Sequence, residues 1–156
     1  MQVVEQPTDS KVSNRDVADV LFDELVVNAA AFEPMRWEDW VSIFDGNDDG
    51  VFWSYMTTLQ EALGLTELQF QQTHSGREEL EAAYARLGFD LQQDAIDHEL
   101  KRAVSGWEQQ IGFYQAAIRN CDNKPEFAQA KRVNEGLLRA AQASLKACQE
   151  GTLVRA

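Results

Sequence analysis

Two long segments in the second half of the chain carry apolar residues at alternating spacings of four and three. The first segment contains Leu100, Val104, Trp107, Ile111, Tyr114, Ile118 and Cys121. The second contains Phe127, Ala130, Asn134, Leu137, Ala141, Leu145 and Cys148. This spacing is typical of helices that pack along a shared seam. Polar residues at 120–124 and Pro125, which suits a first helical position, separate the two segments. The pattern predicts a long antiparallel helical hairpin over residues 90–150.

The two segments also agree on one register. If the turn centres near residue 124, the numbers of facing residues sum to about 248. Trp107 then faces Ala141, and Tyr114 faces Asn134. Large side chains meet small ones, and the polar residue of the second seam meets a phenol that can hydrogen-bond to it. We therefore predict that Trp107 is buried and that the hairpin is the most stable part of the fold.

The first half predicts shorter amphipathic helices. Ser13 can cap a helix of about residues 14–31, and Pro34 suits the first position of the next helix. A third helix ends at Gly64, and capping boxes at Thr66 and Ser75 begin two more. Strand patterns are weak. The predicted fold is all-α: a flexible tail over 1–12, then a single-domain helical bundle over 13–156 with an acidic half at 13–75.

Charge is distributed unevenly along the chain. Residues 1–75 hold 14 acidic and 3 basic residues, a net charge of −11, whereas residues 76–156 hold 12 and 11. The total of −12 argues against direct binding to nucleic acid or to an anionic membrane surface. No apolar run is long enough to cross a bilayer, and the N-terminus does not resemble a signal peptide. The two cysteines lie at opposite ends of the predicted hairpin, too far apart for a disulfide. These features predict a cytoplasmic protein.

The acidic half is the predicted binding surface. Its carboxylates lie off the apolar stripes, and one tryptophan lies off them as well, where it could anchor an interface or simply cover a helix corner. The predicted partner-binding residues are Asp16, Asp19, Asp23, Glu24, Glu38, Asp39, Asp48 and Trp53. The expected partner is a protein with a basic surface. Nucleophile elbows and phosphate-binding glycine loops are absent from the sequence, so we expect no enzymatic activity.

One motif points to a different chemistry. Residues 45–56 (DGNDDGVFWSYM) resemble the loop of the EF-hand family. The resemblance implies Asp45, Asn47 and Asp49 as candidate metal ligands, with calcium as the ion. Met56 departs from the family because it stands where a bidentate glutamate belongs. A helix corner with self-capping Asx residues is the alternative interpretation.

The sequence therefore leaves three hypotheses. The first is a non-enzymatic acidic module that occludes a basic surface, as inhibitors, immunity proteins, chaperones and nucleic-acid charge mimics do, without a cofactor. The second is a weak divalent-cation module using residues 45–56. The third is a structural subunit that forms homo-oligomers through the C-terminal hairpin.

Overall fold

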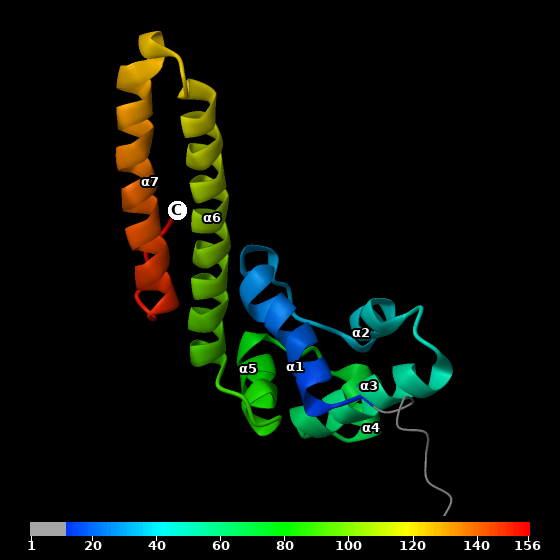
Figure 1. Cartoon of the computed structure of the whole chain (residues 1–156). Coiled ribbons are helices and arrows are strands. Elements are labelled where there is room, and N and C mark those ends of the chain that lie inside the picture. Colours follow the sequence, from blue (N-terminus) through cyan, green and yellow to red (C-terminus); the bar gives the residue numbers. More distant parts are fainter. Residues whose placement is uncertain (1–11) are drawn as a thin grey trace, which may run out of the picture. The chain divides into compact units, whose positions relative to one another are not determined.

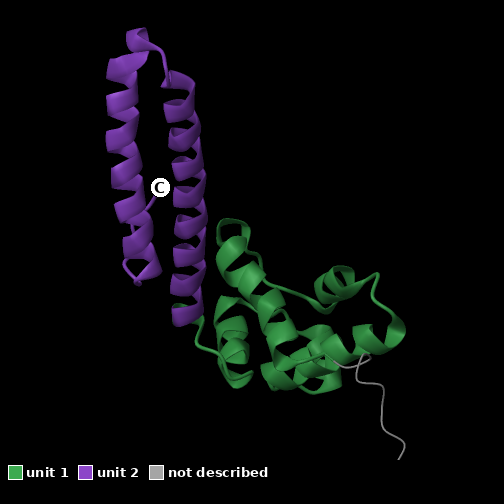
Figure 2. Cartoon of the chain, in the orientation of Figure 1, with its two compact units in different colours: residues 1–92 green, residues 93–156 purple. Residues whose placement is uncertain are grey.

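The computed structural model describes residues 12–156, which are predominantly helical and form no β-strand (Figure 1). This confirms the all-α prediction and the long hairpin. The chain divides into two compact units, residues 1–92 and 93–156, where the sequence predicted one domain over 13–156 (Figure 2). The predicted tail lies outside the described residues except for Val12, whose backbone N–H donates to Ser54 Oγ at 2.8 Å.

The described part of unit 1 contains α1 (Asn14–Phe22), α2 (Trp37–Phe44), α3 (Asp49–Leu63), α4 (Glu67–Gln72) and α5 (Arg77–Arg86). A π-helical turn (Asp23–Val27) and a 3-10 turn (Ala29–Ala31) extend α1, so the predicted 14–31 helix is one nearly continuous helical run. Helices α3 and α5 pack together, α1 packs on both, and α2 packs on α3 and α4.

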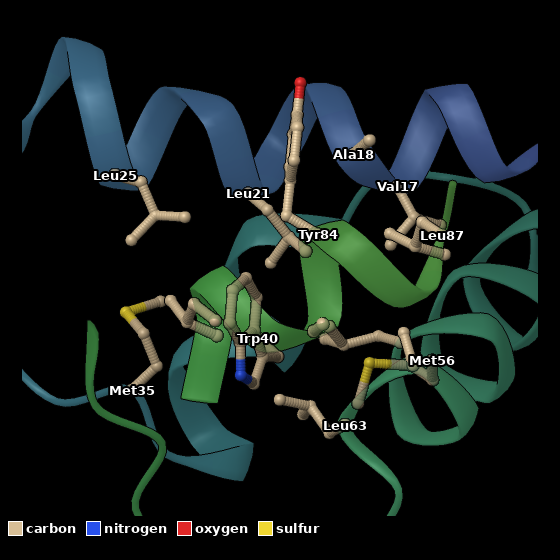
Figure 3. Close-up of a cluster of buried hydrophobic side chains, with 14 of the residues drawn as sticks. Val17, Ala18, Leu21, Leu25, Met35, Trp40, Met56, Leu63, Tyr84 and Leu87 are labelled. Atoms are coloured by element: carbon tan, nitrogen blue, oxygen red, sulfur yellow. The ribbon is translucent and has the colours of Figure 1, made fainter. Parts of the chain in front are cut away.

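One hydrophobic cluster holds unit 1 together. Figure 3 shows Leu21 of α1 and Leu25 of the π-helical turn pointing into a cluster that also contains Met35 and Trp40. The largest fully buried side chains all belong to this unit: Trp40, Tyr84, Phe70, Leu21, Leu59, Leu80 and Val17. Tyr84 and Leu21 are wholly inaccessible to solvent. Burial of this kind contributes about 1.5–3 kcal/mol for each large aliphatic or aromatic side chain.

Helix ends follow the predicted signals where the signals are local. Ser13 caps α1, Thr66 and Gln69 form the capping box of α4, and Gly64 ends α3 with a left-handed φ of 70°. The Ser75 prediction was wrong, since the N-cap of α5 is Gly76.

A tertiary contact of Ser75 explains why the Pro34 prediction was also wrong, since α2 begins at Trp37. Met35 and Ser75 exchange two backbone hydrogen bonds, each of 2.7 Å, and this antiparallel bridge keeps residues just before α2 extended. A pairing between segments so far apart along the chain leaves no signal in the local sequence pattern.

Unit 2 is the hairpin. Helix α6 (Leu91–Cys121) begins at the unit boundary, and α7 (Ala128–Gln149) packs along it after a 3-10 turn at Pro125–Phe127. Asn123 takes a left-handed φ of 63° in the connecting loop, a conformation that asparagine tolerates. Leu100 and Cys148 line one open pocket on the hairpin, and their numbers sum to 248, in agreement with the predicted register.

Far fewer hydrophobic side chains are buried in the hairpin than the sequence suggested. Among residues 93–156, only Ala103, Ala141 and Cys148 are fully buried among the hydrophobic residues, and Trp107 is partly exposed. The packing therefore does not support the prediction that the hairpin is the most stable part of the fold, because its two helices share only one seam. Both cysteines are free thiols. None of the helices in residues 12–156 combines the length and apolarity that crossing a membrane requires.

Candidate functional site

The unit boundary sharpens the charge asymmetry. Residues 1–92 hold 18 acidic and 5 basic residues, a net charge of −13, and residues 93–156 hold 8 and 9, a net charge of +1. All of the net negative charge therefore belongs to unit 1. Such a field attracts cationic partners and raises their association rate.

Arginines of unit 1 serve its own fold. Arg77 donates hydrogen bonds to the backbone carbonyls of Leu25 (3.1 Å) and Ala29 (2.8 Å), and its guanidinium lies over the ring of Phe32. Arg86 donates to the carbonyl of Ala62 at 2.9 Å, near the C-terminus of α3. These guanidinium groups satisfy carbonyls at helix ends, as basic side chains commonly do.

Two of the predicted carboxylates on α1 have local partners. Asp16 accepts the backbone N–H of Ser13 at 2.9 Å and so forms part of the helix cap. Asp19 forms an ion pair with Arg15, at 2.9 Å between Nε and Oδ1. Arg15 also donates to the Tyr84 hydroxyl at 2.9 Å. Burial, and then the charges of Asp16 and Asp19, raise the pKa of the Tyr55 phenol. The charges of both aspartates therefore affect the same side chain of α3.

A second acidic grouping surrounds an open pocket of about 760 Å³. Glu24 and Asp39 of the predicted set line it, and Glu33 adds a third carboxylate. Burial is the main cause that raises the pKa of Glu24, followed by the charges of Asp23 and Asp39. A raised pKa means that the ionised form of Glu24 is disfavoured there, partly by neighbouring carboxylates, and a bound cation would relieve this.

The pocket also has an apolar wall. Met35, which is buried, and Ile43, which is 39% exposed, line it together with Pro34. Arg36 also lines it, and its Nε is 3.8 Å from Asp39 Oδ2. The same Asp39 oxygen accepts the Arg36 backbone N–H at 2.8 Å and so fixes the start of α2. Carboxylates beside an apolar wall suit a long cationic side chain, whose alkyl stem and charged end need different surroundings.

The remaining predicted partner residues are not part of this pocket lining. Asp23 belongs to the π-helical turn after α1, and Glu38 belongs to the first turn of α2. Asp48 caps α3 by accepting the Val51 N–H at 3.0 Å. Trp53 is 54% exposed, and its ring meets Phe52 edge-on with a centroid distance of 5.0 Å. The structure thus groups Glu24 with Asp39 and leaves Asp48 and Trp53 elsewhere, at the start of α3.

The EF-hand-like segment folds as a helix corner. The predicted break over 45–50 is shorter than expected, because α3 already begins at Asp49. Asp45 is exposed, and the side-chain amide of Asn47 donates to the Phe44 carbonyl at 2.8 Å. Met56, in the place of the bidentate ligand, is buried in the core. Within the described residues, no group of three or more His, Cys, Asp or Glu side chains is arranged to hold a metal ion.

Sequence reasoning missed Glu33, Ile43 and His74 as pocket residues. Glu33 and His74 flank the Met35–Ser75 bridge, which brings the segment before α2 beside the segment before α5. Ile43 lies on α2 away from the buried Trp40 and Phe44. The sequence signal for Ile43 was an apolar residue outside the helical stripe formed by positions 37, 40, 41 and 44.

No model of a protein family matches this chain, and neither does a curated protein or a solved structure.

Proposed function

We propose that this chain is a non-enzymatic binding module that uses acidic unit 1 to occlude a basic surface on a partner protein in the cytoplasm. The observation that carries the proposal is the pocket whose lining combines three carboxylates, Glu24, Glu33 and Asp39, with an apolar wall. A lysine or arginine of the partner would lay its alkyl stem along Ile43 and Pro34 and bring its charged end to the carboxylates. Inhibitors, immunity proteins, chaperones and mimics of nucleic-acid charge all act by such occlusion.

The net charge of unit 1 would contribute mainly to the rate of association. Opposite charges steer the approach of a partner, and this effect weakens as salt shortens the Debye length from about 10 Å at 0.1 M to about 3 Å at 1 M. The pocket would supply the specific contact and slow dissociation. Binding should also lower the pKa of Glu24, because a cation favours the ionised carboxylate.

The test uses an arginine- and lysine-rich peptide as the probe, with binding measured by calorimetry and stopped-flow kinetics at low and high salt. Charge removal by Glu24→Gln together with Glu33→Gln should slow association by roughly an order of magnitude at low salt. The matched control is Glu108→Gln with Glu135→Gln, which removes the same charge from unit 2. Equal losses in the two variants, or binding that ignores salt, would contradict the proposal.

A further inference from the structure

Helix α7 ends in a turn that sends the chain back along the hairpin of unit 2. Gly151 takes a left-handed φ of 97°, and its N–H donates to the Cys148 carbonyl at 3.1 Å. The Thr152 N–H donates to the Ala147 carbonyl at 2.9 Å. These two bonds form a Schellman motif, in which a left-handed glycine ends the helix. Residues 152–156, which we call the strap, then run between α6 and α7, where Figure 2 marks the chain end.

The strap is bonded to both helices of the hairpin. On α6, Trp107 Nε1 donates to the Val154 carbonyl at 2.7 Å. On α7, the Cys148 thiol donates to the same carbonyl at 3.3 Å and accepts the Val154 N–H at 3.4 Å. Arg155 adds an ion pair with Glu99 of α6 at 3.0 Å. Val154 therefore joins α6 to α7, and the strap occupies both the donor and the acceptor of the Cys148 thiol.

The strap also approaches the backbone of α6 closely. A Cβ built at Gly106 would lie 2.9 Å from the Cβ of Ala156, well inside the optimal carbon–carbon separation of about 3.5–4.0 Å. A Cβ built at Gly112, on the same helix, would meet nothing within 4 Å. Glycine destabilises a helix interior relative to alanine. The packing of the strap therefore accounts for the glycine at position 106.

The strap covers buried groups although it is itself largely exposed. Ala103, which is buried, borders one open pocket together with Leu153 and Ala156. Cys148, which bonds to the strap, is only 3% exposed. Leu153 is 39% exposed, and the side chain of Arg155 is 73% exposed. A segment with so few buried contacts of its own opens locally at a much smaller free-energy cost than the helices beneath it.

We propose that the strap is a conformational gate that clamps α6 to α7 and controls access to the Cys148 thiol. In the closed form, the strap covers the thiol and holds it by two hydrogen bonds. In the open form, the Cys148 thiol and the Trp107 indole are released together, while both helices stay formed. The gate lies within unit 2 and is independent of the acidic pocket of unit 1.

The test is the rate at which iodoacetamide alkylates each cysteine of the full chain, measured by mass spectrometry of the digested protein. The thiolate displaces iodide, so a C–S bond forms, and iodide and the thiol proton pass to the buffer. Cys121 is a free and partly exposed thiol at the other end of α6, and it serves as the internal reference. In the wild-type protein, Cys148 should react more slowly than Cys121 by about tenfold or more, because it reacts only while the strap is open.

Two variants open the strap in different ways. Gly106→Leu places a side chain in the space of Ala156, so alkylation of Cys148 should accelerate by about tenfold while the reference cysteine is unchanged. The matched control is Gly112→Leu, which makes the same change on the same helix where nothing lies within 4 Å, and it should leave both rates unchanged. Trp107→Phe keeps an aromatic ring but loses the indole donor, and it should accelerate alkylation by roughly fivefold, the factor that one net hydrogen bond contributes.

Circular dichroism verifies that the helices are intact, and Trp107→Phe decides the question in the same assay if Gly106→Leu loses helicity. Equal rates for the two cysteines of the wild-type protein would overturn the proposal, because the reagent would then reach Cys148 through the open pocket beside Leu100 with the strap closed. Unchanged alkylation in a helical Gly106→Leu variant, or equal acceleration in Gly112→Leu, would also overturn it. Opening of the strap exposes little surface, so a rate that rises steeply even at low urea would mean that unfolding of the hairpin exposes the thiol instead.

Discussion

Replacement of Leu21 by alanine tests whether the cluster in unit 1 is the core of the protein. Leu21 is wholly buried where α1 packs on α3 and α5. The substitution removes three carbons, at about 0.8 kcal/mol each, for a transfer loss of about 2.4 kcal/mol. A residual cavity of about 60 Å³ would add about 1.4 kcal/mol at about 24 cal/mol per Å³. The expected loss in the free energy of unfolding is therefore about 4 kcal/mol.

Urea unfolding, followed by tryptophan emission and circular dichroism, measures this loss. With a slope of about 2 kcal/mol per molar urea, the midpoint should fall by about 2 M. Val27→Ala is the control, because Val27 is 55% exposed at the end of the same helical run, and it should change stability by less than about 0.5 kcal/mol. A loss below about 1 kcal/mol for Leu21→Ala would refute the packing of α1 described above.

Three further predictions concern the acidic half. The pKa of Glu24 is raised in the folded state above its ordinary value of 4.5. The protonated carboxyl therefore favours folding at pH values below 4.5, and this contribution to stability is lost as the pH rises through the raised pKa. Glu24→Gln should therefore have the stability of the wild type at about pH 4 and be more stable than the wild type at about pH 7. The difference should be less than about 0.5 kcal/mol, because the group is partly solvated, and unfolding measured across a pH series checks its sign. Calcium should bind no tighter than about millimolar, as read from tryptophan emission, because the corner at residues 45–48 lacks a bidentate ligand. Met56→Glu should destabilise the protein instead of improving binding, since Met56 is 2% exposed in the core; calcium-dependent stabilisation of this variant would refute that reasoning.

The features that the sequence predicted correctly are those that depend on neighbouring residues. Ser13, Thr66 and Gly64 act at helix ends through their own side chains or backbone freedom, and the seam of the hairpin repeats over many turns. Burial was predicted less well. Trp107 lies on a regular apolar stripe and is still partly exposed, because the stripe meets only one other helix. A periodic pattern identifies which face packs, but it does not reveal how many elements cover that face.

The candidate site was predicted as a surface and not as a pocket. Glu24 and Asp39 were named because they are acidic and lie off the apolar stripes, and the structure brings these two together. Glu33 and His74 could not be found in the same way, since their proximity depends on contacts between distant segments. Asp48 was named as a binding residue but caps α3 instead, because an acidic helix cap and an acidic binding residue look the same in the sequence.

The bridge between Met35 and Ser75 has a consequence for how the acidic pocket comes into being. It closes a loop of about forty residues, and closing such a loop costs roughly 3 kcal/mol of chain entropy. Glu33 and Pro34 border one side of the bridge and His74 borders the other, so the pocket exists only after closure. A nascent or partly unfolded chain would carry every one of these side chains and still have no pocket. Any ligand held there would in turn keep the two ends of the loop together, because binding to the closed form alone stabilises that form.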